Sequence, residues 1–129
     1  MNGNELQIFR IVVPVSEPET AAQFYSRLLD LEGKNVGGGR FYFDCGGVIL
    51  ALLKNDTTPN SEYIYFAVGD LEDIFLRAKE LGCLSQNDVH GSSAGEIMIR
   101  PWGERSFYAF DPFGNGLCFV DKDTLFTGR

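Results

Sequence analysis

The chain has 129 residues, a formal net charge of −7, and 44% hydrophobic and 22% charged residues. This length suits one compact domain, 1–129, because two separate domains would each be too small to bury a core. Nucleic acids and anionic membranes are bound by clustered Lys and Arg, so this acidic balance argues against both partners. A net negative charge is more compatible with a neutral or cationic small ligand than with these anionic partners.

The sequence shows neither a long apolar run nor a basic, then apolar, beginning, so we expect a cytoplasmic protein. Cys45, Cys83 and Cys118 are odd in number and have no CxxC spacing. This pattern favours reduced thiols over a disulfide framework or a cysteine-built zinc site.

One pattern of elements occurs twice. An extended run at 10–15 precedes an amphipathic stretch at 20–31, and a similar run at 63–68 precedes a second amphipathic stretch ending at Gly82. More strand-like segments follow each. We therefore predict two β-α-β-β-β modules, at about 7–55 and 61–121, and a tail at 122–129.

The helix ends carry sequence signals. Ser16 and Glu19 have the spacing of a capping box around Pro18, which predicts a helix from about Pro18 to Asp30. Asp70 is the predicted N-cap of the second helix, and Gly82 stands where a left-handed C-cap is expected.

The remaining segments are strands and one long polar loop. The loop at 83–95 is rich in glycine and serine and is a candidate mobile lid or variable binding loop. Strands are predicted at 40–44, 48–53, 96–100, 105–110 and 116–121.

Two blocks carry a family resemblance. They are the helix start Ser16-Glu17-Pro18-Glu19 with Gln23-Phe24-Tyr25, and the run Arg100-Pro101-Trp102-Gly103-Glu104-Arg105-Ser106-Phe107-Tyr108-Ala109-Phe110-Asp111-Pro112-Phe113-Gly114-Asn115. With these blocks the chain resembles, over about 7–121, the vicinal oxygen chelate superfamily. This superfamily includes glyoxalase I, extradiol dioxygenases, fosfomycin-resistance transferases and bleomycin-resistance proteins. The resemblance implies an α+β fold in which two βαβββ modules form an open, curved, eight-stranded mixed sheet, a cup, with one helix outside each half.

The resemblance also implies where a metal would be held. Metal-binding relatives have His, Glu or Gln at the positions resembling Arg10 and Tyr63, a Glu at that resembling Cys118, and a fourth ligand near Leu50 or Ala51. A lone thiolate cannot hold an oxygen-preferring cation or complete a histidine site. The only histidine, His90, lies in the long loop, so we predict no metal and no cofactor.

Strand alternation indicates which side chains line the cup. If Val13 and Val15 face the helices, Arg10 faces the cup, as do Tyr63 and Tyr65 in the second module. Arg10 would then need a carboxylate, from Glu96 or Asp44, unless it grips a ligand anion. Tyr63 and Tyr65 suit an aromatic ligand, although tyrosines in strands also serve as plain packing residues.

Further candidates line the cup less directly. Trp102 either borders the cup mouth or wedges strands apart, and Cys118 is either a ligand contact or a small buried residue. No catalytic residue can be assigned, and Glu96 is the one candidate general base. The predicted ligand-binding residues are Arg10, Tyr63, Tyr65, Glu96, Trp102 and Cys118.

The prediction is a metal-free homodimer that binds or sequesters an aromatic or cationic compound, an antibiotic among the candidates, as the resemblance to bleomycin-resistance proteins implies. One alternative is an enzyme, either a glyoxalase-like lyase or dioxygenase with other metal ligands, or a metal-independent isomerase or lyase. The other is a non-catalytic assembly subunit, whose cup would be plugged by Phe41, Tyr65, Trp102 and Phe107.

Overall fold

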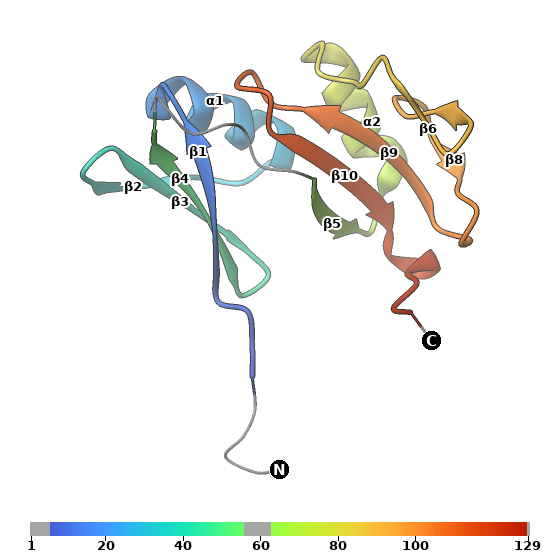
Figure 1. Ribbon diagram of the computed structural model, residues 1–129. Coiled ribbons are helices and arrows are strands. Elements are labelled where there is room, and N and C mark those ends of the chain that lie inside the picture. Colours follow the sequence, from blue (N-terminus) through green and yellow to red (C-terminus); the bar gives the residue numbers. More distant parts are fainter. Residues whose placement is uncertain (1–5, 56–62, 129) are drawn as a thin grey trace.

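The chain folds as two similar halves placed side by side (Figure 1). A computed structural model describes residues 6–55 and 63–128. In the first half the four strands form a sheet of order β1-β4-β3-β2. Its elements are β1 (Arg10–Val15), α1 (Pro18–Leu29), β2 (Lys34–Gly37), β3 (Arg40–Cys45) and β4 (Val48–Lys54).

The second half repeats this plan with the sheet order β5-β10-β9-β8. β1 pairs in parallel with β4, and β5 pairs in parallel with β10, so each half begins with an edge strand. The elements of the second half are β5 (Ile64–Val68), α2 (Leu71–Glu80), β8 (Met98–Ile99), β9 (Arg105–Phe110), β10 (Gly116–Asp121) and the short helix η1 (Lys122–Thr124). A hairpin of β6 (Asp88–Val89) and β7 (Ser92–Ser93) is inserted between α2 and β8.

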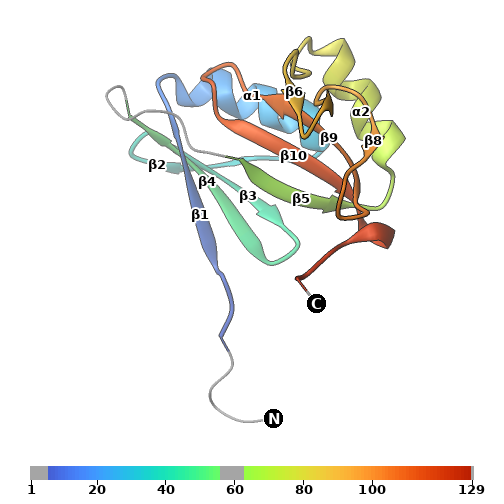
Figure 2. The same ribbon diagram turned by 45° about the vertical axis from the view of Figure 1, so that its right-hand side comes forward.

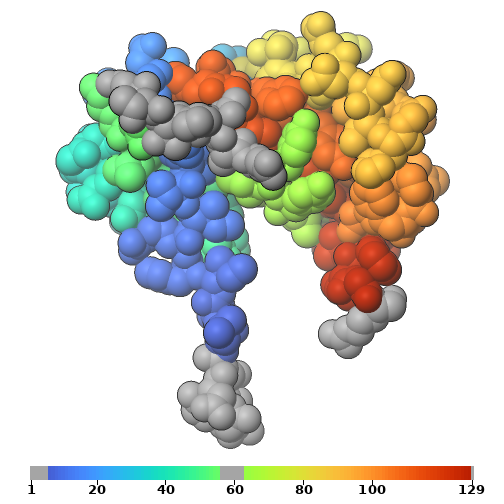
Figure 3. All heavy atoms as spheres, viewed as in Figure 1, coloured from blue at the N-terminus to red at the C-terminus, as the bar shows by residue number. Residues whose placement is uncertain are grey.

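This arrangement confirms the predicted α+β fold of two modules. Helices α1 and α2 cover one side of the molecule, and the opposite faces of the sheets form the open cup (Figure 2). Of the ten strands in the described residues, eight form two separate four-stranded sheets, and β6 and β7 form a two-stranded one. The two ends of the described chain project from the same side, with an open hollow between them (Figure 3).

The core lies between the sheets and the helices. Val13 and Val15 are 0% and 1% exposed, whereas Val12, between them, is 51% exposed. The alternation predicted for the first strand is therefore confirmed. In the second half Phe107 and Phe119 stack with ring centroids 5.3 Å apart. Full burial of each such side chain contributes about 1.5–3 kcal/mol.

The helix ends follow the sequence signals only in part. At α2, Asp70 Oδ1 accepts from the backbone N of Asp73 at 3.1 Å, and Gly82 has a φ of 69°, as predicted. At α1 the capping box is wrong: the N-cap is Glu17, and its side chain makes no capping bond. Pro18 at the first helical position begins α1 instead, because its φ is preset for a helix.

Several segments differ from the predicted boundaries. β2 was not among the predicted strands, and the loop at 83–95 contains the β6–β7 hairpin. The predicted strand 96–100 is reduced to Met98–Ile99, because Arg100 already enters a turn in which its N donates to Glu104 O and its O accepts from Gly103 N.

The turn after β9 joins the two halves. Asn115 Nδ2 donates to Asp111 Oδ2 at 2.8 Å and to the carbonyl of Pro14, on β1, at 2.9 Å. The Tyr25 hydroxyl of α1 also donates to Asp111 Oδ2. The polar side chains of this turn therefore hold the first half against the second.

Candidate functional site: an aromatic cup beside an apolar crevice

The cup face of the first sheet carries Arg10. Register pairs Arg10 with Ile49, and Ile49 with Asp44, so these three side chains form one row across β1, β4 and β3. The Arg10 guanidinium lies over the rings of Phe9, at 4.9 Å, and Tyr42, at 5.1 Å. Such contacts contribute about 0.5–1 kcal/mol at exposed sites.

Arg10 makes no ion pair with any described residue, so the predicted pairing with Glu96 or Asp44 is wrong. Asp44 Oδ1 instead accepts from the backbone N of Gly47 at 2.8 Å in the β3–β4 turn. The exposed position of Arg10 explains the difference, because water and the flanking aromatic rings make a carboxylate partner unnecessary.

The cup face of the second sheet is aromatic. Tyr63 and Tyr65 are 40% and 57% exposed, as alternation predicted. The ring of Tyr63 packs edge-to-face on Tyr108 at 5.1 Å and close to Phe110 at 5.8 Å. Gly116 makes room for this ring, because a Cβ added there would lie 2.7 Å from Tyr63 Cδ1. Burial raises the pKa of Tyr63, which keeps its hydroxyl protonated at neutral pH.

Cys118 lies under a cover formed by the segment at 83–95. It is 0% exposed and clusters with Ala94, Tyr108 and Val120. Burial raises the pKa of Cys118 to about 11, so it is a protonated thiol at neutral pH. Of the two roles considered for Cys118, this placement supports that of a small buried residue. It leaves no surface of Cys118 for contact with a ligand.

Arg100 holds this cover in place. It is 2% exposed, and its guanidinium lies 5.1 Å from the Tyr108 ring centroid. Its Nη1 donates to Ser92 Oγ and Ser93 O, both at 3.1 Å, and its Nη2 donates to Ala94 O at 3.3 Å. The guanidinium also donates to Ser106 Oγ at 3.1 Å, Ser106 O at 3.0 Å and Glu96 O at 3.2 Å. The segment is therefore fastened to the second sheet, and the structure gives no support to a freely mobile lid.

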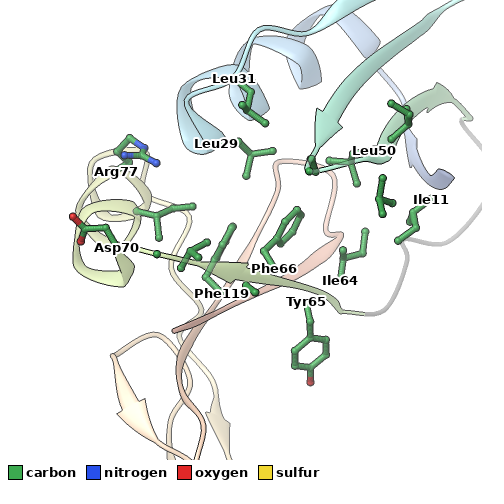
Figure 4. Close-up of a pocket in the computed structure, with 18 of the residues that line it drawn as sticks. Ile11, Leu29, Leu31, Leu50, Ile64, Tyr65, Phe66, Asp70, Arg77 and Phe119 are labelled. Atoms are coloured by element: carbon green, nitrogen blue, oxygen red, sulfur yellow. The ribbon is translucent and has the colours of Figure 1, made fainter. Parts of the chain in front are cut away.

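An apolar crevice separates the two halves, with a volume of about 630 Å³. Figure 4 shows Leu29, Leu50 and Phe66 directed into it, whereas the Tyr65 ring points away from the crevice into open space. Ile49, from the row that contains Arg10, and Tyr65, from the second sheet, both line the crevice, so it lies between these two parts of the molecule. Asp70, Asp73 and Arg77 stand at the end next to α2, where Arg77 and Asp73 form an ion pair.

Glu96 and Trp102 lie away from this crevice. Glu96 is exposed and lines a separate hollow of about 240 Å³ together with Lys79 and Ser85. Trp102 is half-buried, donates from Nε1 to Glu104 Oε1 at 2.6 Å, and packs edge-to-face on His90 at 4.8 Å. The structure thus brings Arg10, Tyr63 and Tyr65 to the cup and places Glu96 outside it.

Sequence reasoning missed Phe9 and Tyr42, which support Arg10, and Tyr108, which supports both tyrosines. The period-two pattern of β3 did place Tyr42 on the same face as Arg40, and pairing with β4 would have brought it near Arg10. The proposed plug of the cup is contradicted, because Phe41 and Phe107 pack in the helix-side core while Tyr65 is exposed.

The family's metal position is occupied by side chains that do not fit a metal. Arginine stays protonated, the hydroxyl of Tyr63 keeps its proton, and Cys118 is a covered thiol. Among the described residues no group of three or more His, Cys, Asp or Glu side chains could hold a metal ion. In the same part of the chain, neither α1 nor α2 has the length and apolarity required to cross a membrane.

Paired βαβββ modules around an open cup define a class of proteins that bind small molecules between the modules. Residues 7–119 match the Glyoxalase/Bleomycin resistance protein/Dioxygenase superfamily, so the chain belongs to this superfamily. No match was found among curated proteins.

Several solved structures share the fold. "Oxidase ChaP-H2" is 26% identical, with a TM-score of 0.77 over 90% of this chain and 93% of that one. Lactoylglutathione lyase from Agrobacterium tumefaciens is 19% identical, with a TM-score of 0.69 over 91% and 94%. TioX from Micromonospora sp. ML1 is 17% identical, with a TM-score of 0.69 over 90% and 98%. The last two likenesses concern the fold alone.

Proposed function

We propose that the protein binds, and by binding sequesters, an aromatic small molecule in its cup without a metal or cofactor. The observation that carries this proposal is the pair of exposed rings of Tyr63 and Tyr65 beside an apolar crevice of about 630 Å³. Tyrosine offers a wide contact face and a polar tip at low cost in side-chain entropy, so it suits a flat ligand.

The side chains at the family's metal position support a metal-independent role. A divalent cation there would lie beside the positive charge of Arg10 and would have to displace protons from Tyr63 and Cys118. Because burial raises the pKa of both groups, that displacement is unfavourable near neutral pH.

A homodimer is part of the same proposal. β1 and β5 are the edge strands that begin the two sheets, and apolar side chains such as Ile8 and Phe9 are 62% exposed next to the cup. A second copy would cover this surface and complete the walls of the cup. Cys45, Cys83 and Cys118 are free thiols, which suits the reducing cytoplasm.

Native mass spectrometry of freshly purified, untagged protein tests this proposal. The expected spectrum shows a dimer that carries no divalent metal, and any small molecule that co-purifies should be lost in Tyr65→Ala but kept in a matched exposed variant, Leu76→Ala. A stoichiometric divalent metal on each subunit would overturn the proposal.

The second candidate is an enzyme, either a metal-dependent lyase or dioxygenase or a metal-independent isomerase or lyase. The likeness to "Oxidase ChaP-H2" at 26% identity favours this candidate for the same cup. Turnover of an aromatic compound that requires an added divalent metal would establish a metal-dependent enzyme. Turnover in the presence of a chelator that Tyr65→Phe abolishes would establish a metal-independent one.

A further inference from the structure

The net negative charge of the chain is not spread evenly. Many of its carboxylates lie on or next to the helices; they include Glu17, Glu19, Glu72 and Glu80, while Asp70 and Asp73 line the α2 end of the crevice. The cup face of the first sheet, by contrast, carries Arg10, Lys34 and Arg40 against a single carboxylate, Asp44.

Among the residues that the structure describes, the second sheet adds no unbonded carboxylate to the cup. Its exposed cup residues are Tyr63, directly before β5, and Tyr65 and Ala67 on β5. Glu104, farther along this sheet, accepts from Trp102 Nε1 at 2.6 Å and from the backbone N of Phe126 at 2.8 Å. The described residues on the cup faces of the two sheets therefore carry a positive net charge, although the whole chain is acidic.

Arg10 is suited to hold an anion. Its guanidinium lies over the rings of Phe9 and Tyr42, which fixes its direction, and no described residue accepts a hydrogen bond from it. A guanidinium held by its flat face keeps the N–H donors along its edge for a bidentate contact with a carboxylate. Asp44, the acidic residue in the same row, is held by Gly47.

The row of residues that contains Arg10 and the strand that carries Tyr65 lie on opposite sides of the crevice. Ile49 is the register partner of Arg10, and Ile49 and Tyr65 line the crevice from its two sides. Arg10 and the exposed rings of Tyr63 and Tyr65 lie on the cup faces of the two sheets, so a planar ligand that rests on the tyrosines can direct a substituent toward the first sheet, where Arg10 lies. Building on the proposed function, we propose that the ligand is an anionic aromatic compound, such as an aryl carboxylate, whose negative group is bound by Arg10.

Three probes of one shape separate charge from aromatic packing. They are 2-naphthoate, neutral 2-naphthamide and 2-naphthylmethylammonium, titrated calorimetrically into the full-length protein at about 0.15 M salt, where long-range charge effects are screened. We expect naphthoate to bind about 10-fold more tightly than the amide, because one charge-assisted contact is worth about 1.4 kcal/mol or more. The ammonium should bind more weakly than the amide.

Two variants test whether Arg10 causes the preference for naphthoate over the amide. Arg10→Gln should weaken naphthoate binding about 10-fold and leave amide binding within about 2-fold, because only the charged contact is removed. Arg27→Gln makes the same charge change on the exposed surface of α1 and should leave both affinities unchanged. Circular dichroism melting confirms that both variants are folded.

The outcomes distinguish this inference from the function on which it rests. If the amide binds but naphthoate binds no more tightly, or if Arg10→Gln behaves like Arg27→Gln, the anionic ligand is overturned and the aromatic cup stands. If none of the three probes binds at millimolar concentration, the aromatic-binding function fails and this inference fails with it.

Discussion

The hydroxyl of Tyr25 on α1 donates to Asp111 Oδ2 at 2.7 Å, so a helix of the first half is bonded directly to a carboxylate of the second. Asp111 Oδ1 accepts from the backbone N of Phe113 at 2.8 Å and of Asn115 at 2.9 Å, and Oδ2 also accepts from Asn115 Nδ2 at 2.8 Å. Four donors match the capacity of an ionised carboxylate. Asp111 therefore organises its own turn and fastens it to α1.

Replacing Asp111 should cost much of the stability of the fold. Asp111→Ala leaves the Tyr25 hydroxyl and the donors of Asn115 without this acceptor, and the expected loss is about 3 kcal/mol in the free energy of unfolding. The exposed control Asp88→Ala should change it by less than about 0.5 kcal/mol. Urea unfolding followed by circular dichroism measures both, and a loss below 1 kcal/mol in Asp111→Ala would contradict this role.

The same contact predicts a dependence on alkaline pH. Burial, and then the Asp111 carboxylate, raise the pKa of Tyr25 above its usual value. Below a pH of about 10, the unfolded value, the contribution of the protonated hydroxyl is fully present. Above it the unfolded chain loses a proton that the folded chain keeps, so stability falls by up to about 1.4 kcal/mol per pH unit until the folded pKa is reached.

Tyr25→Phe tests this linkage. The variant should be less stable than the wild type at pH 8, and its stability should fall less steeply between pH 10 and 11. Cys83 and Tyr108 also have raised pKa values, but they are common to both proteins. Urea unfolding curves of both proteins across this pH range measure the free energy of unfolding as a function of pH. Identical slopes of this free energy against pH would exclude Tyr25 as a source of the alkaline sensitivity.

The fold was largely predictable from sequence, for physical reasons that particular elements show. The period of two in Arg10–Val15 and the helical stripes of α1 and α2 reflect burial on one face, which a sequence records directly. The capping box at Ser16 was misleading, because Pro18 alone is enough to begin α1. The brevity of β8 depends on the turn at Arg100, which no local pattern reveals.

Gly116 should prove necessary for the position of Tyr63. In Gly116→Ala the added Cβ would meet the Tyr63 ring at 2.7 Å, so the ring must move. We expect a loss of about 1–2 kcal/mol in stability, typical of overpacking, together with weaker binding of 2-naphthamide. Gly69→Ala is the control, because its Cβ would find its nearest neighbour, Lys122, at 3.7 Å. Unchanged amide binding in Gly116→Ala would show that the position of Tyr63 does not matter to the ligand.

Arg100 should govern access to Cys118. Arg100→Met keeps the length of the side chain but removes all its donors, so the end of the cover that Arg100 holds, at 92–95, should loosen and hydrogen exchange there should accelerate. Because the pKa of Cys118 is raised to about 11, alkylation by iodoacetamide at pH 8 should be slow in the wild type and about 10-fold faster in the variant.

The half-buried Cys45 provides an internal reference in the same experiment, since it lies in the other half of the molecule. Its alkylation rate should be equal in both proteins, and Arg27→Met should alter neither thiol. Protection of Cys118 that persists in Arg100→Met would mean that packing of Ala94, without the guanidinium, suffices to hold the cover.

The candidate site was less predictable than the fold, because its features depend on pairing between distant strands. Alternation placed Arg10, Tyr63 and Tyr65 on the cup face, but the rings that support Arg10 include one from β3, two strands away. Glu96 was expected in the cup because a strand was predicted through it; it precedes β8 and lies on the surface. Cys118 was expected at the cup from the family resemblance, and the structure shows it covered by a segment that the sequence shows only as polar.

The hydrogen bond from Asn115 to Pro14 is one of the contacts that set the position of the first half relative to the second. Each sheet is complete within its own half, and the described contacts that join the halves are side-chain bonds and helix packing, without strand pairing between the two sheets. Substitutions at these few contacts can widen or narrow the space between two intact walls. Evolution can therefore change the size of the ligand that fits by changing the distance between the two sheets, while each half keeps its own folded structure.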